Sequence, residues 1–515
     1  MGIPSNGPPP IPESSRKDPR VHFEHGPVKP GRAVHESARK SIVAVVPASD
    51  AANRQPGQSS YRQAYRALSP LLARWGPVCE VNYPESQLDF AIAQVQQRGD
   101  SPISLAMVPF GSLYPTRLAQ NAAYFIWDYP EIPHEYLCYS PRPDWVAMAN
   151  KLALILVDNT FTAQALRRSG INTPVEIVPV PVLERYFSVP VWNSERMTRL
   201  DCTAYLFPQV GSGGIDPWSP GPPPTANNLH HRLVSAYRKC LKPIVPSRVH
   251  KRLLRWSSRG KPKSPSPAMN YLPCAQGSHL ELSQIVYTAI TNPADSRDNW
   301  RDIVSAYVYV FAEQPDVTLV MVLDMPVARR AELLNRIYEF YLRQVRGLSC
   351  KLALVLGPLN HQQKQQLVLG TTYFVSAARA KGIYPALGQF LAAGRPALAP
   401  CHSGLADSFG PDAGLVIASH PEYARIPGDP ERRLVTTRHR IVWQSLVEHF
   451  RQSHAWARQN SPDYHIMSAR ARKRTRARAG MDAVWPRLQA ALESLVQAAP
   501  RPRSPAFLST CKAAG

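Results

Sequence analysis

The stretch TYFVSAARAKGIYPALGQFLAAGRPALAP, residues 372–400, decides the fold. The apolar run TYFVSA predicts a buried strand, the segment after a short loop predicts a helix that ends in glycine, and PALAP predicts a second strand. Units of this kind are typical of parallel α/β sheets, which bind ligands in the loops that follow their strands. This loop and helix present Lys381 and Gln389, with no carboxylate between them.

The same alternation of strand and helix patterns runs through two long parts of the chain. The first part opens with SIVAVVPA at 41–48, and the second opens with QIVYTAI at 284–290. Further apolar strands are expected at 104–110, 122–129 and 151–159, and at TLVMVL, KLALVLG, TYFVSA, PALAP and GLVIA. The pattern predicts an α/β protein of two doubly wound, Rossmann-like domains that face each other across a ligand-binding cleft.

One predicted helix carries a stripe of large apolar residues. The segment NWRDIVSAYVYVFAEQ places them at helical spacing, on one face. The residues of the stripe are Trp300, Ile303, Val304, Tyr307 and Phe311. We interpret them as core packing of the second domain and not as a cofactor site.

Shifts in composition divide the 515 residues into six segments. The proline-rich start lacks apolar periodicity and predicts a disordered tail, and a stretch rich in Gly, Pro and Ser separates the two α/β series. The segments are a tail at 1–40, an N-terminal domain at 41–195, a linker at 196–282, a C-terminal domain at 283–430, C-terminal helices at 431–500 and a tail at 501–515.

Most of the formal net charge of +23 lies in two segments. Residues 229–263 carry 11 Lys and Arg and no acid, and residues 468–480 carry 6 and no acid. Each segment is either a solvated face or linker, or a binding surface. In 229–263 the cations alternate with apolar residues, in two short amphipathic pieces broken by Pro243 and Pro246, which suits an anionic membrane surface. Nucleic acid is the weaker alternative, because no base-reading motif accompanies the charge.

Cysteine spacing and hydropathy predict a cytoplasmic protein. The eight cysteines are scattered without a C-x-x-C pair, which indicates neither a zinc site nor a disulfide framework. No run of 18 apolar residues occurs, and the start MGIPSNGPPP lacks a signal-peptide pattern. The basic segment 229–263 would place such a protein on the inner face of the membrane.

Several segments resemble family 4-like glycosyltransferases, in the same order along the chain. TNPADSRDNWRDIVSAY with EQPDVTLVMVL resembles the start of their C-terminal domain, and YFVSAARAKGIYPALGQFLAAGRPALAP resembles their donor-binding unit. FIWDYPEIPHE and LVDNTFTAQALRRSGINTPVEIVPVPV resemble segments of their N-terminal domain, and the stretch from RHRIVWQSL to SARARKR resembles their C-terminal helices. The likeness covers roughly residues 41–190 and 283–495.

The resemblance implies an enzyme with the two-domain GT-B fold. Such an enzyme moves a sugar from a nucleotide-sugar donor to a glycan or lipid-linked acceptor, mostly with retention of the anomeric configuration and usually without a metal or other cofactor. The donor binds the C-terminal domain and the acceptor side is the N-terminal domain. The alternative is a catalytically silent relative that binds glycan or protein partners within an assembly.

The donor site that the resemblance implies departs from the family pattern. In ADSRDNW, Arg297 matches the family's Arg, whereas Asp298 stands where a Lys is expected. Lys381 and Gln389 occupy the positions of two glutamates, the second of which typically accepts hydrogen bonds from the ribose. The implied donor-binding residues are Arg297, Ser376, Lys381, Gly382 and Gln389.

Each departure also has a structural interpretation. Asp295 or Ser296 would cap the next helix, with Asp298 in its first turn. Lys381 would pair with the donor diphosphate, or would mark a site that no longer catalyses. Gln389 would bond a ribose hydroxyl through its amide, or would be an exposed helix position.

In the first domain the loop WDYPEIPHEY clusters polar residues. Asp128 and His134 are the candidate catalytic residues, because a carboxylate and an imidazole can orient an acceptor hydroxyl or transfer its proton. A histidine in a proline-rich loop can equally be structural. Arg297 and Lys381 would stabilise the charge that develops on the leaving diphosphate.

Overall fold

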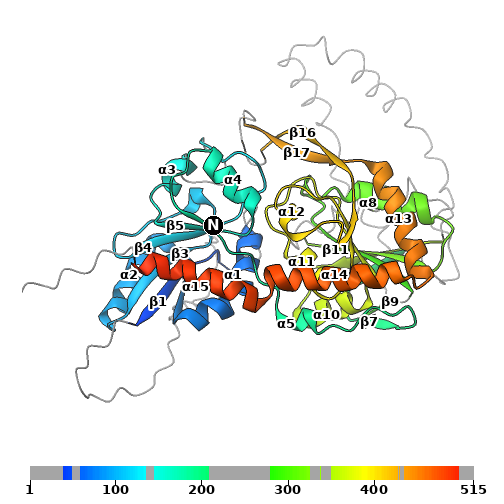
Figure 1. The fold of residues 1–515 in the computed structure, drawn as a ribbon, viewed down its shortest axis with the longest axis horizontal. Helices are drawn as coiled ribbons and strands as arrows, with labels where there is room; N and C mark the ends of the chain where they lie inside the picture. Colours follow the sequence, from blue (N-terminus) through cyan, green and yellow to red (C-terminus); the bar gives the residue numbers. More distant parts are fainter. Residues whose placement is uncertain are drawn as a thin grey trace, which may run out of the picture.

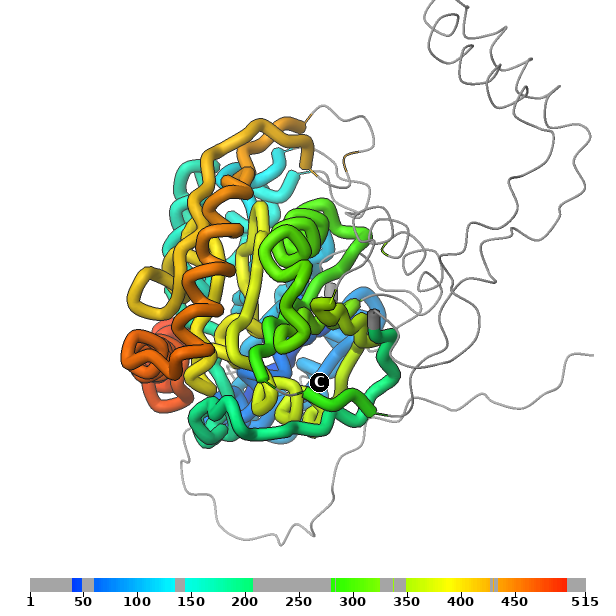
Figure 2. Tube along the Cα trace, turned by 90° about the vertical axis from the view of Figure 1, so that its right-hand side faces the viewer, coloured from blue at the N-terminus to red at the C-terminus, as the bar shows by residue number. Residues whose placement is uncertain are grey.

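The structure is a computed structural model, which describes residues 39–48, 58–134, 144–207, 279–282, 284–324, 337, 349–426, 429 and 434–497. These residues form two α/β domains that lie side by side, each on its own sheet (Figure 1). Figure 2, turned by 90°, shows the C-terminal domain in front of the N-terminal one. The basic segment 229–263 lies outside the described residues.

A six-stranded parallel sheet, in the order β2-β1-β3-β4-β5-β6, forms the N-terminal domain. Its strands are β1 (Lys40–Val45), β2 (Val78–Val81), β3 (Ser101–Ala106), β4 (Gln120–Phe125), β5 (Leu154–Val157) and β6 (Val175–Ile177). The accompanying helices are α1 (Gln58–Trp75), α2 (Pro84–Gln97), η1 (Phe110–Ser112), α3 (Trp145–Ala149) and α4 (Thr160–Arg168). Helices cover both faces, which is why a strand such as β5 is apolar and buried at every position.

The C-terminal domain has a seven-stranded sheet in the order β15-β14-β13-β10-β11-β12-β8. Its strands are β8 (Ala204–Phe207), β10 (Ile285–Thr291), β11 (Val317–Leu323), β12 (Lys351–Leu356), β13 (Tyr373–Val375), β14 (Ala397–Ala399) and β15 (Gly414–Val416). All neighbours are parallel except β8, which pairs antiparallel with β12. The strand order reverses between β10 and β13, so the loops after these two strands frame the expected ligand site.

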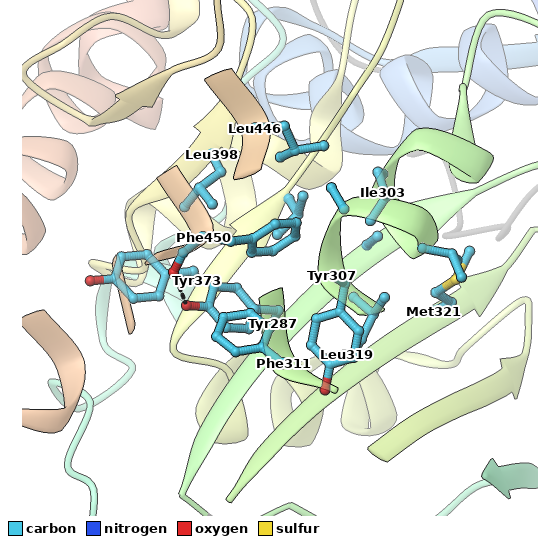
Figure 3. Close-up of a cluster of buried hydrophobic side chains, with 14 of the residues drawn as sticks. Tyr287, Ile303, Tyr307, Phe311, Leu319, Met321, Tyr373, Leu398, Leu446 and Phe450 are labelled. Atoms are coloured by element: carbon cyan, nitrogen blue, oxygen red, sulfur yellow. Dashed lines mark hydrogen bonds between the residues drawn. The ribbon is translucent and has the colours of Figure 1, made fainter. Parts of the chain in front are cut away.

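Aromatic packing forms the core on one face of this sheet (Figure 3). The helices of this domain are α8 (Trp300–Phe311), α10 (His361–Gly370), α11 (Pro385–Ala392), α12 (Leu405–Ser408) and α13 (Trp443–Arg458). Tyr287 on β10 stacks on Tyr373 of β13 and meets Phe450 of α13 edge-on. The predicted stripe of α8, from Trp300 to Phe311, is buried in the same cluster, which confirms its interpretation as core.

Helices α14 (Pro462–Ala479) and α15 (Met481–Gln497) tie the two domains together. α14 packs on α11 of the C-terminal domain, and α15 then crosses to the N-terminal domain, where Leu488, Leu492 and Leu495 join the core beneath β1 and β4 (Figure 1). The basic run 468–480 is therefore a structural helix. Arg478 pairs with Asp158 of the N-terminal domain at 2.8 Å, and Arg474 pairs with Asp412 of the C-terminal domain at 2.8 Å.

Short elements complete the described chain. They are α5 (Glu184–Phe187), β7 (Thr198–Leu200), β9 (Leu280–Leu282), β16 (Ser419–Arg425) and β17 (Val435–Ile441). β7 and β9 pair with each other and β8 joins the C-terminal sheet, so both ends of the expected linker 196–282 contribute strands. In the described part of the chain, no helix combines the length and the apolar character needed to cross a membrane.

Candidate functional site

Three loops meet where the two domains face each other. The loops after β10 and β13 carry Arg297 and Lys381, and the loop after β4 of the N-terminal domain carries Asp128. Asp128 forms an ion pair with Arg297 across the domain boundary. Lys381 Nζ lies 2.5 Å from Asp298 Oδ1. The structure thus brings together the proposed residues Asp128, Arg297 and Lys381, with Gly382 beside them, and it pairs each of the two cations with a carboxylate.

Arg297 lies between two carboxylates. It pairs with Asp128, and its Nη2 donates to Asp295 Oδ2 at 2.7 Å. Burial opposes ionisation of Asp295, but its hydrogen bonds to Arg297 and the guanidinium charge outweigh burial and lower its pKa to about 2. Burial lowers the pKa of Arg297, yet the charges of Asp128 and Asp295 prevail and raise it. Asp295 and Arg297 are therefore both ionised at neutral pH.

We call Asp128, Asp295, Arg297, Asp298 and Lys381 the charged corner. It contains three carboxylates and two cations, so its formal charge is −1. The side chains of Lys381 and Asp298 are 17% and 8% exposed, so solvent screens their pair only in part. A diphosphate approaching Arg297 or Lys381 would have to compete with carboxylates already bound to them.

The amide of Gly382 is also occupied by the N-terminal domain. Gly382 N donates to Asp128 Oδ1 at 2.5 Å, and Asn159 Nδ2 donates to Gly382 O at 2.5 Å. A Cβ at position 382 would lie 2.2 Å from the carbonyl oxygen of Trp127, so only glycine allows this close approach of the two backbones. Asp128 thus holds the two donors, Arg297 and the Gly382 amide, that an anionic ligand would otherwise use.

The loop before α8 does not form the helix cap that the sequence suggested. Helix α8 begins at Trp300, with Asn299 as the N-cap residue at φ 45°, and not after Asp295 or Ser296. Asp298 accepts a hydrogen bond from Asn292 N at 2.7 Å and pairs with Lys381. Capping by Asp295 or Ser296 was therefore wrong, because Asp295 instead binds its near neighbour Arg297.

The other proposed residues lie at different depths. Ser376 is buried, and its Oγ accepts from Ala378 N at 3.3 Å, within the turn after β13. Gln389 is half-buried on α11 and faces a cavity, so it is not the exposed helix position that was the alternative. His134 is exposed and is the last described residue before 135–143, and the charged corner contains no contact to it.

A cavity of about 480 Å³ adjoins the charged corner and is lined by both domains. Its volume lies in the range of small-molecule sites. Arg66 of α1, Arg185 of α5, His361 and Lys364 of α10, and Gln389 of α11 line it, and we call this the basic pocket. Tyr384, whose ring lies 5.2 Å from Lys381 Nζ, separates the basic pocket from the charged corner.

Positive charge is in excess in the basic pocket. Asp158 lines it too, but this carboxylate is already paired with Arg478. Arg185 Nη2 lies 3.0 Å from His361 Nδ1. Burial lowers the pKa of His361 first, and the nearby charges of Arg185, Lys364 and Arg66 lower it further. The pocket therefore has the electrostatic character of an anion site.

Sequence reasoning missed Arg66, Arg185 and Lys364. They lie in three elements far apart in the chain, and none belongs to a motif, so no local sequence signal marked them. A second cavity, of about 560 Å³, lies by Lys40 and Trp75 at the opposite edge of the N-terminal sheet, where parallel strands begin and ligands are not expected. Among the described residues no group of three or more His, Cys, Asp or Glu is placed to hold a metal ion.

Solved structures of glycosyltransferases align with most of this chain. A glycosyltransferase from Rickettsia africae aligns with 90% of this chain and 100% of its own, at 10% identity and a TM-score of 0.50. A sucrose-phosphate synthase from Thermosynechococcus elongatus aligns over the same shares, at 12% identity and a TM-score of 0.47. Neither a protein-family model nor a curated relative matches the sequence. The chain therefore has a fold of two Rossmann-like domains in the GT-B arrangement, as the sequence predicted.

Proposed function

We propose that the chain is a glycosyltransferase that binds a nucleotide-sugar between its two domains and transfers the sugar to a glycan or lipid-linked acceptor. The observation that carries the proposal is the basic pocket, a cavity of about 480 Å³ lined by both domains at the edge where such sheets bind ligands. Its excess of positive charge suits a phosphate-bearing ligand, and Gln389, which also lines it, would offer its amide to a ribose hydroxyl.

The sugar transfer would use the basic pocket for the nucleotide and the charged corner for the acceptor. In the transfer, the bond between sugar C1 and a diphosphate oxygen breaks, a bond from C1 to the acceptor oxygen forms, and the acceptor proton passes to Asp128. Cations stabilise the negative charge left on the diphosphate. With the nucleotide in the basic pocket, its sugar reaches past Tyr384 toward the charged corner, where Asp128 orients the acceptor hydroxyl. We further propose retention of the anomeric configuration.

A panel of nucleotide-sugars tests the proposal. A specific donor at about 100 times its Kd should stabilise the fold by about 2.7 kcal/mol in a thermal-shift assay. The same donor should release its nucleoside diphosphate when a suitable acceptor is added, with the product anomer read by nuclear magnetic resonance. If no common nucleotide-sugar or nucleoside diphosphate shifts the transition at millimolar concentration, the proposal fails.

Asp128→Asn isolates the proposed role of this carboxylate. Loss of a group that acts in proton transfer costs about a hundredfold or more in turnover. We expect that loss in kcat, with donor affinity changed far less, and a smaller effect for His134→Gln. The matched control is Asp100→Asn, which lies directly before β3 at the opposite edge of the sheet. Equal turnover in Asp128→Asn and Asp100→Asn would remove Asp128 from the mechanism.

A second candidate is a nucleotide-binding protein that does not catalyse transfer. The specific observation in its favour is the Lys381–Asp298 pair, which fills the corner with mutually neutralised charges. This candidate expects the same thermal shift, but no release of nucleoside diphosphate with any acceptor. Measurable turnover by the unaltered chain excludes it.

A further inference from the structure

The cations that sequence reasoning assigned to the diphosphate are already neutralised in this fold. Arg297 is bound by Asp128 and Asp295, and Lys381 is bound by Asp298. The charged corner as a whole is negative by one unit, because it holds three carboxylates and two cations. A diphosphate carries two to three negative charges, so it would be repelled there unless several ion pairs broke first.

The basic pocket, which adjoins the negative charged corner, carries an excess of positive charge. Arg66, Arg185 and Lys364 line it, from an N-terminal helix, the connection between the domains and a C-terminal helix. None of the three forms an ion pair with an acid among the residues that the structure describes. Asp324 offsets the charge of Lys364 in part, whereas Arg66 and Arg185 add to the repulsion on it.

The contact between Arg185 and His361 fixes which nitrogen of the imidazole can donate to an anion. Because a guanidinium can only donate, His361 Nδ1 must accept from Arg185 Nη2 across their 3.0 Å contact. A neutral His361 then carries its proton on Nε2, where it can donate to a phosphate oxygen. The like charges of Arg66, Arg185 and Lys364 repel one another, and a bound polyanion relieves that repulsion.

We propose that the diphosphate of the nucleotide ligand binds to Arg66, Arg185 and Lys364 of the basic pocket, with His361 as a neutral donor, and not to Arg297 and Lys381. The inference rests on the proposed function for the identity of the ligand as a nucleoside diphosphate. The three cations alone indicate a ligand with phosphate groups, and Gln389, which also lines the pocket, is the reason to expect a ribose beside them.

Calorimetric titration with a nucleoside diphosphate, the matching nucleoside and inorganic pyrophosphate tests the proposal on the full chain. Arg66→Gln and Lys364→Gln should each weaken diphosphate binding about tenfold or more, as expected for loss of a charge-assisted contact, and should leave nucleoside binding unchanged. Arg470→Gln and Lys473→Gln are the matched controls, because both side chains are exposed on α14. Thermal unfolding of every variant checks that it remains folded.

The outcomes separate this inference from the proposed function. If Arg297→Gln or Lys381→Gln weakens diphosphate binding while the pocket variants do not, the proposed function stands and this inference is wrong. If pyrophosphate binds through Arg66 and Lys364 but no nucleoside diphosphate binds more tightly than pyrophosphate, the anion site is supported and the nucleotide function is overturned. If neither ligand binds, both are wrong.

Discussion

Lys381 and Asp298 show how two departures from a family pattern can compensate each other's charge. Each residue alone was anomalous, because one replaces a carboxylate and the other replaces a cation. The structure places their charged atoms 2.5 Å apart, with little exposure to solvent. The sequence suggested that Lys381 pairs with the donor diphosphate, whereas the structure pairs Lys381 directly with Asp298. Their separation of 83 positions in the chain hides such a contact from any local pattern.

A double-mutant cycle tests the exchanged pair. Lys381→Glu leaves two facing carboxylates in a mostly buried site, and we expect a loss of roughly 3 kcal/mol in the free energy of unfolding. Adding Asp298→Lys restores opposite charges and should recover at least half of that loss, although Asn292 N then loses its acceptor. Urea denaturation measures all four proteins. Additive effects of the two substitutions would show that the residues are not coupled.

His402 predicts a loss of stability in mild acid. It is buried, stacks on His439 with ring centroids 4.0 Å apart, and donates from Nε2 to Ala378 O. Burial, followed by the charge of His439, lowers its pKa to about 3. The unfolded chain binds a proton on this residue below about pH 6.5, whereas the folded chain does not. Stability therefore falls as the pH drops from about 6.5 toward 3, by at most about 1.4 kcal/mol per pH unit from this group.

Urea denaturation at pH 7 and pH 5 measures the effect of His402. His402→Gln should reduce the difference between the two pH values, even if the variant is less stable at both. His465→Gln, which lies on α14 away from this cluster, is the control. An unchanged pH difference in His402→Gln would contradict the assignment.

At the scale of elements, apolar patterns predicted the central strands of both sheets but did not mark helix α14. Runs such as IVAV in β1 and LVMV in β11 are buried on both faces, so composition alone indicates a parallel strand. Helix α14 presents Tyr464, Ser468, Ala471, Thr475 and Ala479 to the interior at helical spacing, but mostly with small or hydroxylic side chains. A search for apolar periodicity passes over such a face, and its arginines left both a solvated segment and a binding surface open. Only the resemblance of this stretch to C-terminal helices indicated a helix.

Helix α15 should be essential to the N-terminal domain despite its place at the other end of the chain. Leu488 is fully buried against the helix and strands of that domain. Leu488→Ala should reduce the free energy of unfolding by about 2–5 kcal/mol, the cost of a large-to-small change in a packed core. Leu118→Ala is the control, because that side chain is 45% exposed and should change stability by less than about 0.5 kcal/mol. Equal, small effects in thermal and urea unfolding would show that α15 only rests on the surface.

At the scale of the whole molecule, the site depends on contacts between domains that sequence patterns cannot reveal. The alternation of strands and helices predicted two domains and a cleft. It could not predict that Asp128 reaches across to Arg297, or that Thr160 meets Asp407 at 2.7 Å. The basic pocket is likewise made from three parts of the chain, so it exists only once the domains are placed.

Gly382→Ala tests how tightly the domains are held. A Cβ at this position would lie 2.2 Å from the backbone of Trp127, so the loop after β13 must move away from the N-terminal domain. We expect a larger radius of gyration in small-angle scattering and weaker ligand binding. Gly388→Ala is the milder comparison, because its Cβ would meet a side-chain methyl of Val182 at 3.2 Å. Identical scattering profiles for the unaltered chain and Gly382→Ala would contradict the closed domain contact.

Hydrogen–deuterium exchange with and without a saturating nucleoside diphosphate tests the central claim most directly. The claim is that this chain binds a nucleotide between its domains, at the basic pocket. It predicts slower exchange in peptides that cover 181–187, 360–366 and 382–391, which line the pocket from both sides, and unchanged exchange around Lys40 and Trp75 at the far edge of the N-terminal sheet. Saturating ligand that leaves all three segments unprotected, or protects only residues outside the cleft, would contradict it.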